Sequence, residues 1–135
     1  MEAIEAIESV LASRSDVRLA YLFGSAARGR ARASSDLDIG ILFDDLPEPH
    51  ELDRLTSDLE GAGGHCVDLV VLNTASPLLA HEVLRTGRLL VCRDEDDRAR
   101  FELRAIARYL DTAPLRALQR ASLREWAEAA RARPS

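Results

Sequence analysis

The sequence predicts an α/β fold: a small mixed sheet with flanking helices, followed by a C-terminal helical tail. Two observations support this class. Over residues 1–92, short apolar runs typical of strands alternate with stretches of helical periodicity. Over residues 93–135 only the helical periodicity remains. We therefore expect one domain at residues 1–92 and a helical extension at residues 93–135 that packs on it.

Apolar runs typical of mostly buried strands predict strands at residues 17–23, 37–43, 66–72 and 89–92. The first run stops at Gly24-Ser25, which opens a loop or a short helix. The second run is followed by acidic residues and Pro47, and proline ends a strand because it has no amide hydrogen to donate.

Helical periodicity predicts helices at residues 3–13, 49–60 and 77–85. We expect Gly61 and the glycines at 63 and 64 to end the second of these helices, and Gly87 to end the third. Pro114 interrupts the periodicity of the extension. Because proline suits the first turn of a helix, the extension is expected to contain two helices.

The composition restricts the class of function. A chain of 135 residues fits one domain, and its formal charge of −5 argues against a protein that grips long nucleic acid. Every basic residue is arginine, which excludes mechanisms that need a catalytic lysine, P-loop chemistry among them. The sequence has no apolar stretch long enough to cross a membrane, and its acidic start does not resemble a signal peptide, so we expect a cytoplasmic protein.

Two aspartates stand at the start of the second predicted strand. Side chains two residues apart on a strand point to the same face, so Asp36 and Asp38 are expected side by side while Leu37 and Ile39 face the core. Two neighbouring carboxylates repel each other, and a bound cation relieves this repulsion. Their hard oxygen ligands favour Mg²⁺ or Mn²⁺.

Asp68 interrupts the third predicted strand, where a buried charge is costly unless it is paired or bound to metal. If the second and third strands are neighbours, Asp68 can face the same site as Asp36 and Asp38. Three carboxylates can hold two metal ions about 3.5–4 Å apart, as in two-metal phosphoryl chemistry. This last step depends on a strand pairing that the sequence does not show.

Gly24-Ser25 is the complementary candidate, for binding phosphate. Glycine lets the backbone approach an anion closely, successive amides at a loop-to-helix junction favour phosphate, and serine adds a hydroxyl donor. Arg28, Arg30 and Arg32 follow, and at least one of them can clamp a triphosphate. Each feature alone has an ordinary structural explanation. Gly24-Ser25 can be a common turn, and the Asp36/Asp38 pair can be a surface turn with a capping aspartate. The arginines can be a solvated loop, and Asp68 can pair with a buried arginine. Their order at compatible strand ends favours a site.

The spacing of Gly24-Ser25, ten residues, then Asp36-Leu37-Asp38 resembles the signature of the nucleotidyltransferase superfamily related to DNA polymerase beta. The string GSAARGRARASSDLDIGILF is similar to its minimal branch, which includes MntA-type antitoxins paired with HEPN-domain ribonuclease toxins of the HepT type. The resemblance implies the polymerase beta-like nucleotidyltransferase fold at residues 1–92. It implies that Asp36 and Asp38 bind two Mg²⁺ ions, that Asp68 completes one ion's site and helps to activate the attacking hydroxyl, and that Gly24 and Ser25 hold the terminal phosphates.

The resemblance also implies an activity: transfer of AMP from ATP to a tyrosine of a HEPN toxin, by which the chain acts as its antitoxin. Two alternatives stay open at this point. A non-catalytic antitoxin would neutralise the toxin by binding, with the apolar helical tail as its docking face. A small-molecule nucleotidyltransferase would act on an aminoglycoside-like acceptor without any protein partner.

Overall fold

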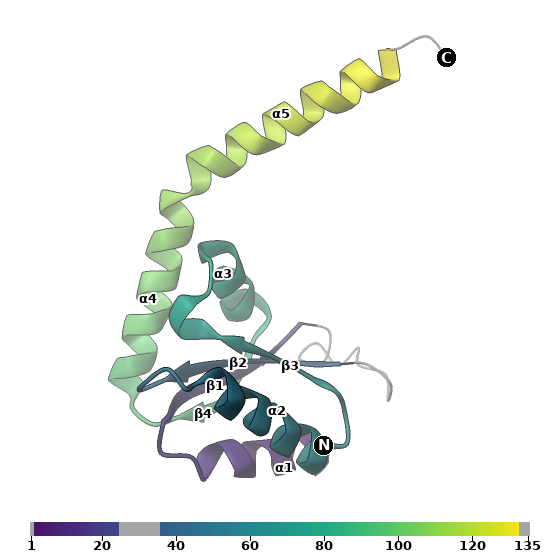
Figure 1. Cartoon of the computed structure of the whole chain (residues 1–135). Helices are drawn as coiled ribbons and strands as arrows, with labels where there is room; N and C mark the ends of the chain where they lie inside the picture. The colour runs from purple at the N-terminus through teal and green to yellow at the C-terminus, as the bar shows by residue number, and fades with distance from the viewer. Residues whose placement is uncertain (1, 25–35, 133–135) are drawn as a thin grey trace.

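The computed structural model describes residues 2–24 and 36–132 (Figure 1). Within these ranges the predicted α/β class is confirmed. The elements, in chain order, are α1 (Glu2–Ala12), β1 (Val17–Phe23), β2 (Leu37–Phe43), α2 (Pro49–Gly63), β3 (Val67–Val71), the 3-10 helix η1 (Leu72–Thr74), α3 (Pro77–Thr86), β4 (Arg88–Cys92), α4 (Glu95–Asp111) and α5 (Ala113–Ala132).

The described strands form one mixed sheet in the order β3-β2-β1-β4. β1 pairs antiparallel with β2 and with β4, whereas β2 and β3 are parallel. α2 connects the two parallel strands, which need such a crossover because a tight turn cannot join them. The N-terminal ends of β2 and β3 therefore lie side by side, and the Leu37 amide donates to the Cys66 carbonyl at 2.8 Å.

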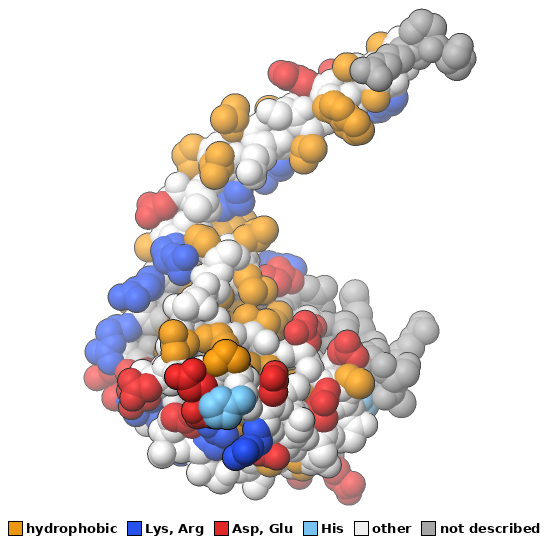
Figure 2. All heavy atoms as spheres, viewed as in Figure 1, with side chains coloured by type: hydrophobic (Ala, Val, Ile, Leu, Met, Phe, Trp, Pro, Cys, Tyr) orange, Lys and Arg blue, Asp and Glu red, His pale blue; other side chains and the backbone are white. Residues whose placement is uncertain are grey.

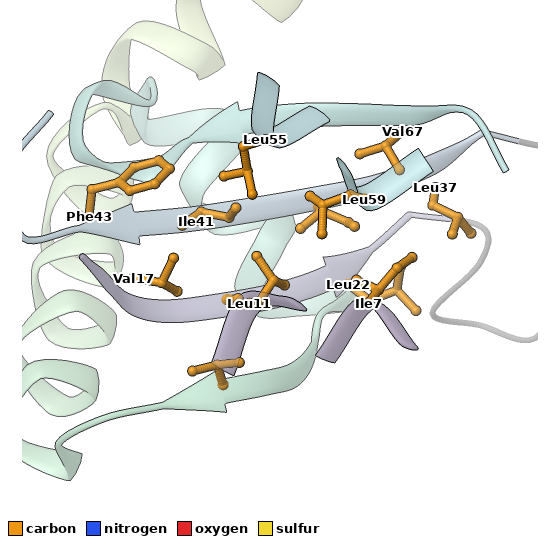
Figure 3. Close-up of a cluster of buried hydrophobic side chains, with 13 residues drawn as sticks. Ile7, Leu11, Val17, Leu22, Leu37, Ile41, Phe43, Leu55, Leu59 and Val67 are labelled. Atoms are coloured by element: carbon orange, nitrogen blue, oxygen red, sulfur yellow. The ribbon is translucent and has the colours of Figure 1, made fainter. Parts of the chain in front are cut away.

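α1 and α2 cover one face of the sheet (Figures 1 and 3). Alternate residues of β2 point into this core, and Leu37, Ile39 and Ile41 are buried there. They pack with apolar residues of the two helices: Ile7, Leu11, Leu55 and Leu59. Because side chains alternate along a strand, this packing directs Asp38 to the opposite face of the sheet.

α2 runs further than the sequence predicts. Gly61 and Gly63 lie inside the helix, and Gly64 ends it with φ +71° and an amide that donates to the Glu60 carbonyl at 2.9 Å. Gly63 stands where α2 meets α1, and a Cβ there would lie 2.6 Å from Cδ1 of Ile7. The glycine at 63 therefore permits close packing of two helices, and only the left-handed residue at 64 serves as the terminator.

α3 and α4 cover the other face, where Ala80, Val83 and Ala105 pack over β1. Polar contacts also hold α4 against β1. The Arg18 guanidinium donates through Nε to Asp97 at 2.8 Å, and the Tyr21 hydroxyl donates to Glu102 at 3.0 Å.

α5 departs from the expectation that the whole extension packs on residues 1–92. It leaves the end of α4 and projects away from the sheet (Figure 1), and none of its residues is buried. Its large apolar residues are exposed instead of facing the core. Among the described helices, none is both long enough and apolar enough for a membrane span.

Candidate active site

Asp38 and Asp68 are partners in the parallel ladder between β2 and β3. This pairing confirms the predicted proximity of the two strands. Leu42 and Val70, which follow the aspartates at even spacing, pack in the cluster below α3 and α4. Both aspartates consequently point to the α3–α4 side of the sheet, at the strand ends. Asp36 lies one residue before β2, at the same edge.

Asp36 and Asp68 lie close enough to Asp38 for their charges to affect its carboxyl group. The pKa of the Asp38 carboxyl is raised above its ordinary value, first because burial penalises the charged form and then because Asp68 and Asp36 repel it. Asp38 is half-buried, whereas Asp36 and Asp68 are exposed. The three predicted aspartates thus form one acidic group around a partly desolvated centre.

The exposure of Asp68 corrects one expectation. β3 is an edge strand, so Asp68 lies in solvent and does not have to be paired to offset the cost of burial. The residues around Asp68 are apolar because neighbours such as Val67 are buried in the core between the sheet and helices α1 and α2. The case for Asp68 therefore depends on its position opposite Asp38 and not on desolvation.

Gly24 lies against the same centre. Its φ is +72°, and a Cβ at this position would collide with Oδ2 of Asp38. The glycine thus leaves room for the Asp38 carboxylate. Its amide donates to Oγ1 of Thr86 at 3.2 Å, and the role of Gly24 in holding phosphate stays a prediction.

Thr86 and Glu60 are two supporting residues that sequence reasoning missed. The Thr86 hydroxyl, at the end of α3, accepts the Gly24 amide and donates to the Glu82 carbonyl at 2.9 Å. The Glu60 carboxylate on α2 accepts the Val67 amide at 2.8 Å, one residue before Asp68. Both residues look like ordinary helix positions in the sequence, and only the tertiary contacts distinguish them.

The remaining candidates for the nucleotide site, Ser25 and Arg28, lie outside the described residues, as do Arg30 and Arg32. Their roles stay predictions.

The donor set suits a hard divalent ion. Carboxylate oxygens are the ligands that Mg²⁺ prefers, and a cation would relieve the repulsion that raises the pKa of Asp38. Among residues 2–24 and 36–132, however, no three histidine, cysteine or acidic side chains are already spaced as a closed metal site. The aspartates are gathered at one edge but would have to adjust to bind an ion.

A protein-family model described as "Polymerase beta, Nucleotidyltransferase" matches residues 5–96. The chain belongs to this nucleotidyltransferase family. The match contains the whole sheet and all three aspartates, and it ends just inside α4.

This nucleotidyltransferase is also similar to individual members of the minimal branch. A protein adenylyltransferase called MntA from Shewanella oneidensis is 34% identical over 93 residues, which are 69% of this chain and 66% of that protein. The alignment thus spans slightly less than two thirds of the relative.

Solved structures give longer matches. A crystal structure of a toxin-antitoxin with AMP-PNP matches with a TM-score of 0.77 and 30% identity, over 89% of this chain and 98% of that one. A chain from the complex of a tri-AMPylated Shewanella oneidensis HEPN toxin with an MNT antitoxin matches with a TM-score of 0.73 and 27% identity, over 90% and 96%. The predicted resemblance to MntA-type nucleotidyltransferases is confirmed.

Proposed function

We propose that this nucleotidyltransferase transfers AMP from ATP to a tyrosine hydroxyl of a HEPN ribonuclease toxin and so acts as the toxin's antitoxin in the cytoplasm. The observation that carries the proposal is the group of Asp36, Asp38 and Asp68 beside Gly24. The similarity to a protein adenylyltransferase, and to an antitoxin bound to a tri-AMPylated toxin, supports the choice of reaction and acceptor.

In the proposed reaction the tyrosine oxygen attacks the α-phosphorus of ATP. A new phosphorus–oxygen bond forms, the bond from the α-phosphorus to the bridging oxygen breaks, and pyrophosphate leaves. Asp36, Asp38 and Asp68 would hold Mg²⁺, which would offset the charge of the triphosphate and lower the pKa of the attacking hydroxyl. Asp68 is our candidate to help accept the hydroxyl proton.

The exposure of the site suits an acceptor on another protein. Asp68 lies on an edge strand and is exposed, so a large substrate can approach it from solvent. Asp38 is half-buried, between the buried Leu37 and Ile39 on its strand and beside the Gly24 backbone. The site thus has a partly buried centre and an exposed edge.

We assign the chemistry to residues 1–92 and recognition of the substrate protein to residues 93–135. Under this division, the exposed apolar helix of the extension favours a protein acceptor over a small molecule.

Two labels of ATP test the reaction and its acceptor. The purified chain is incubated with Mg²⁺, the HEPN protein encoded beside its gene, and ATP labelled with ³²P at either the α or the γ position. The expected result is that only the α label becomes attached to the HEPN protein, on a tyrosine identified by mass spectrometry. If the wild-type chain binds and neutralises the HEPN protein without attaching α label, neutralisation occurs by binding alone and the proposed reaction is wrong.

A further inference from the structure

α5 carries a bare apolar surface. Leu115, Leu118, Leu123 and Trp126, which we call the α5 stripe, are each between 56% and 72% exposed. Figure 2 shows hydrophobic side chains along the projecting helix. Together with three residues of α4, they account for most of the large apolar side chains that are strongly exposed in the described chain. An exposed apolar surface of this extent marks an interaction site.

The stripe is organised as one side of an amphipathic helix. At 3.6 residues per turn, its four members fall on one side of α5. Arg120, Arg124 and Arg131 fall on the opposite side, whereas Arg116 lies at the border of the stripe. A shallow groove lined by Leu118, Gln119, Ser122 and Leu123 lies on the apolar side. This pattern is typical of a helix that lays its apolar side into a groove of a partner.

The direction of α5 is fixed by a stack at its base. The His81 and Tyr109 rings are stacked, with centroids 3.6 Å apart and planes 6° apart, and the Arg116 guanidinium carbon lies 3.5 Å from the Tyr109 centroid. Two groups fit this close to one ring only on its opposite faces. Arg116 also donates to the Tyr109 carbonyl and to the Thr112 hydroxyl, both at 2.8 Å. These contacts join α3, α4 and α5, so the stripe is presented in a defined orientation.

The matches to known proteins indicate what the stripe meets. The match to the nucleotidyltransferase family ends at residue 96, so α5 lies outside the part that defines the chemistry. The match to a chain of the toxin-antitoxin structure with AMP-PNP covers 89% of this chain. Residues 1–111 make up less than that share, so the match extends into α5. At least the first part of α5 thus has a counterpart in a chain of a toxin-antitoxin structure.

We propose that the α5 stripe is the surface on which the HEPN toxin docks, with the stripe lying in an apolar groove of the toxin. This inference rests on the proposed function for the identity of the partner. It assigns binding and chemistry to separate surfaces: α5 holds the toxin, and the aspartate edge modifies it.

A stripe variant and a matched control test the docking surface. The stripe variant is Leu118→Ser with Trp126→Ser. The control is Arg120→Ser with Arg124→Ser, on the opposite side of the same helix. All four residues lie outside the buried core, so neither variant disturbs it. Affinity for the neighbouring HEPN protein is measured by titration calorimetry, and AMP-PNP binding in the presence of Mg²⁺ is measured for the same preparations.

We expect the stripe variant to bind the HEPN protein at least about tenfold more weakly than wild type, a loss of about 1.4 kcal/mol. The control should stay within about twofold, and AMP-PNP binding should be unchanged in both. Equal toxin affinity of stripe variant and wild type would overturn the docking proposal. The proposal is likewise overturned if the stripe instead pairs with a second copy, or binds phosphatidylglycerol vesicles, while toxin affinity is unaffected.

The two proposals fail in different ways. If wild type binds the HEPN protein, the stripe variant does not, and neither attaches AMP, then docking stands and the proposed reaction is wrong. If wild type does not bind the HEPN protein at all, the partner is wrong and the docking proposal is overturned with it.

Discussion

Asp38 and Asp68 stand directly opposite each other on the parallel strands β2 and β3. The pairing brings together two carboxylates that are 30 positions apart in the sequence, and it does so at the end of the sheet where Gly24 leaves space. The resulting repulsion raises the pKa of Asp38, in addition to the effect of burial. Repulsion between these carboxylates lowers the free energy of unfolding when no cation is bound, and this loss of stability can be measured.

Asp38→Asn should stabilise the metal-free protein. A carboxyl whose pKa is raised by folding destabilises the folded state when it is ionised, so removing the charge should raise the free energy of unfolding at pH 7. We expect an increase of less than about 1 kcal/mol, since solvent screens the charge of a partly exposed group. Urea denaturation in EDTA measures it.

The control for this variant is Asp53→Asn, an exposed position on α2, which should be neutral. Adding Mg²⁺ should stabilise wild type more than Asp38→Asn, because a ligand stabilises only the state that binds it. If metal-free Asp38→Asn is clearly less stable than wild type, the Asp38 carboxylate stabilises the fold, and the predicted cost of its charge is wrong.

Gly24→Ala should impair both folding and activity. The residue has a positive φ, and its new Cβ would collide with the Asp38 carboxylate. We expect a loss of stability of about 1–2 kcal/mol and a fall in nucleotidyl transfer of at least about tenfold. Thermal unfolding and the α-label assay measure the two effects.

Gly61→Ala is a matched control for the same substitution. Gly61 lies inside α2, and no atom lies within 4 Å of the added Cβ, so the change should be neutral or should stabilise by up to about 1 kcal/mol. An active Gly24→Ala enzyme of normal stability would contradict the role of glycine beside Asp38.

Thr86→Val should lower the rate of AMP transfer, because it removes the contact that holds the Gly24 backbone. The substitution keeps the shape of the side chain but removes the hydroxyl that accepts the Gly24 amide. We expect a destabilisation of about 1 kcal/mol from the unsatisfied amide, together with a fall in the transfer rate. Thr86→Ser, which restores the hydroxyl, should recover most of the rate. A failure of serine to rescue would mean that only the packing of the threonine matters.

Asp97→Asn should remove a pH-dependent contribution to stability. Asp97 accepts hydrogen bonds from Arg100 and Arg18, which lower the pKa of its carboxyl. A depressed pKa stabilises the fold above the unfolded-state value of about 3.9, and this stabilisation is lost as pH falls through the folded-state pKa. Urea midpoints should therefore show wild type above Asp97→Asn at pH 6–7, with the difference shrinking below about pH 4. A difference that stays constant down to pH 3 would contradict this origin.

The strands were predictable because each is a short, mostly apolar run that contains one charged residue. The bounds of β1 and β2 agree with the prediction. Gly63 shows a limit of local rules, because its close packing on Ile7 is a tertiary contact that looks like a helix stop in the sequence.

The site was predictable in its residue types but not in its geometry. The orientation of Asp38, opposite to that of Leu37 and Ile39, follows from the period of a β-strand, whereas Asp36 lies one residue before β2. The register that places Asp68 opposite Asp38 depends on how α2 crosses between the strands, and no pattern in the sequence encodes it. The same is true of the edge position of β3, which leaves Asp68 exposed, and of the Thr86 contact to Gly24. For α5, periodicity predicts a helix but cannot tell whether its apolar side faces its own core or a partner.

The most direct test of the aspartate site is the rate at which α-³²P-labelled AMP is attached to the neighbouring HEPN protein by wild type, Asp38→Asn and Asp53→Asn. All three proteins should bind the HEPN protein equally, since helix α5 projects away from the sheet that contains β2 and Asp38 (Figure 1). We predict that Asp38→Asn loses at least about a hundredfold in rate, because metal-assisted charge stabilisation is worth several kcal/mol, while Asp53→Asn retains the wild-type rate. A folded Asp38→Asn protein that labels the toxin as fast as wild type would contradict the proposed role of the aspartates.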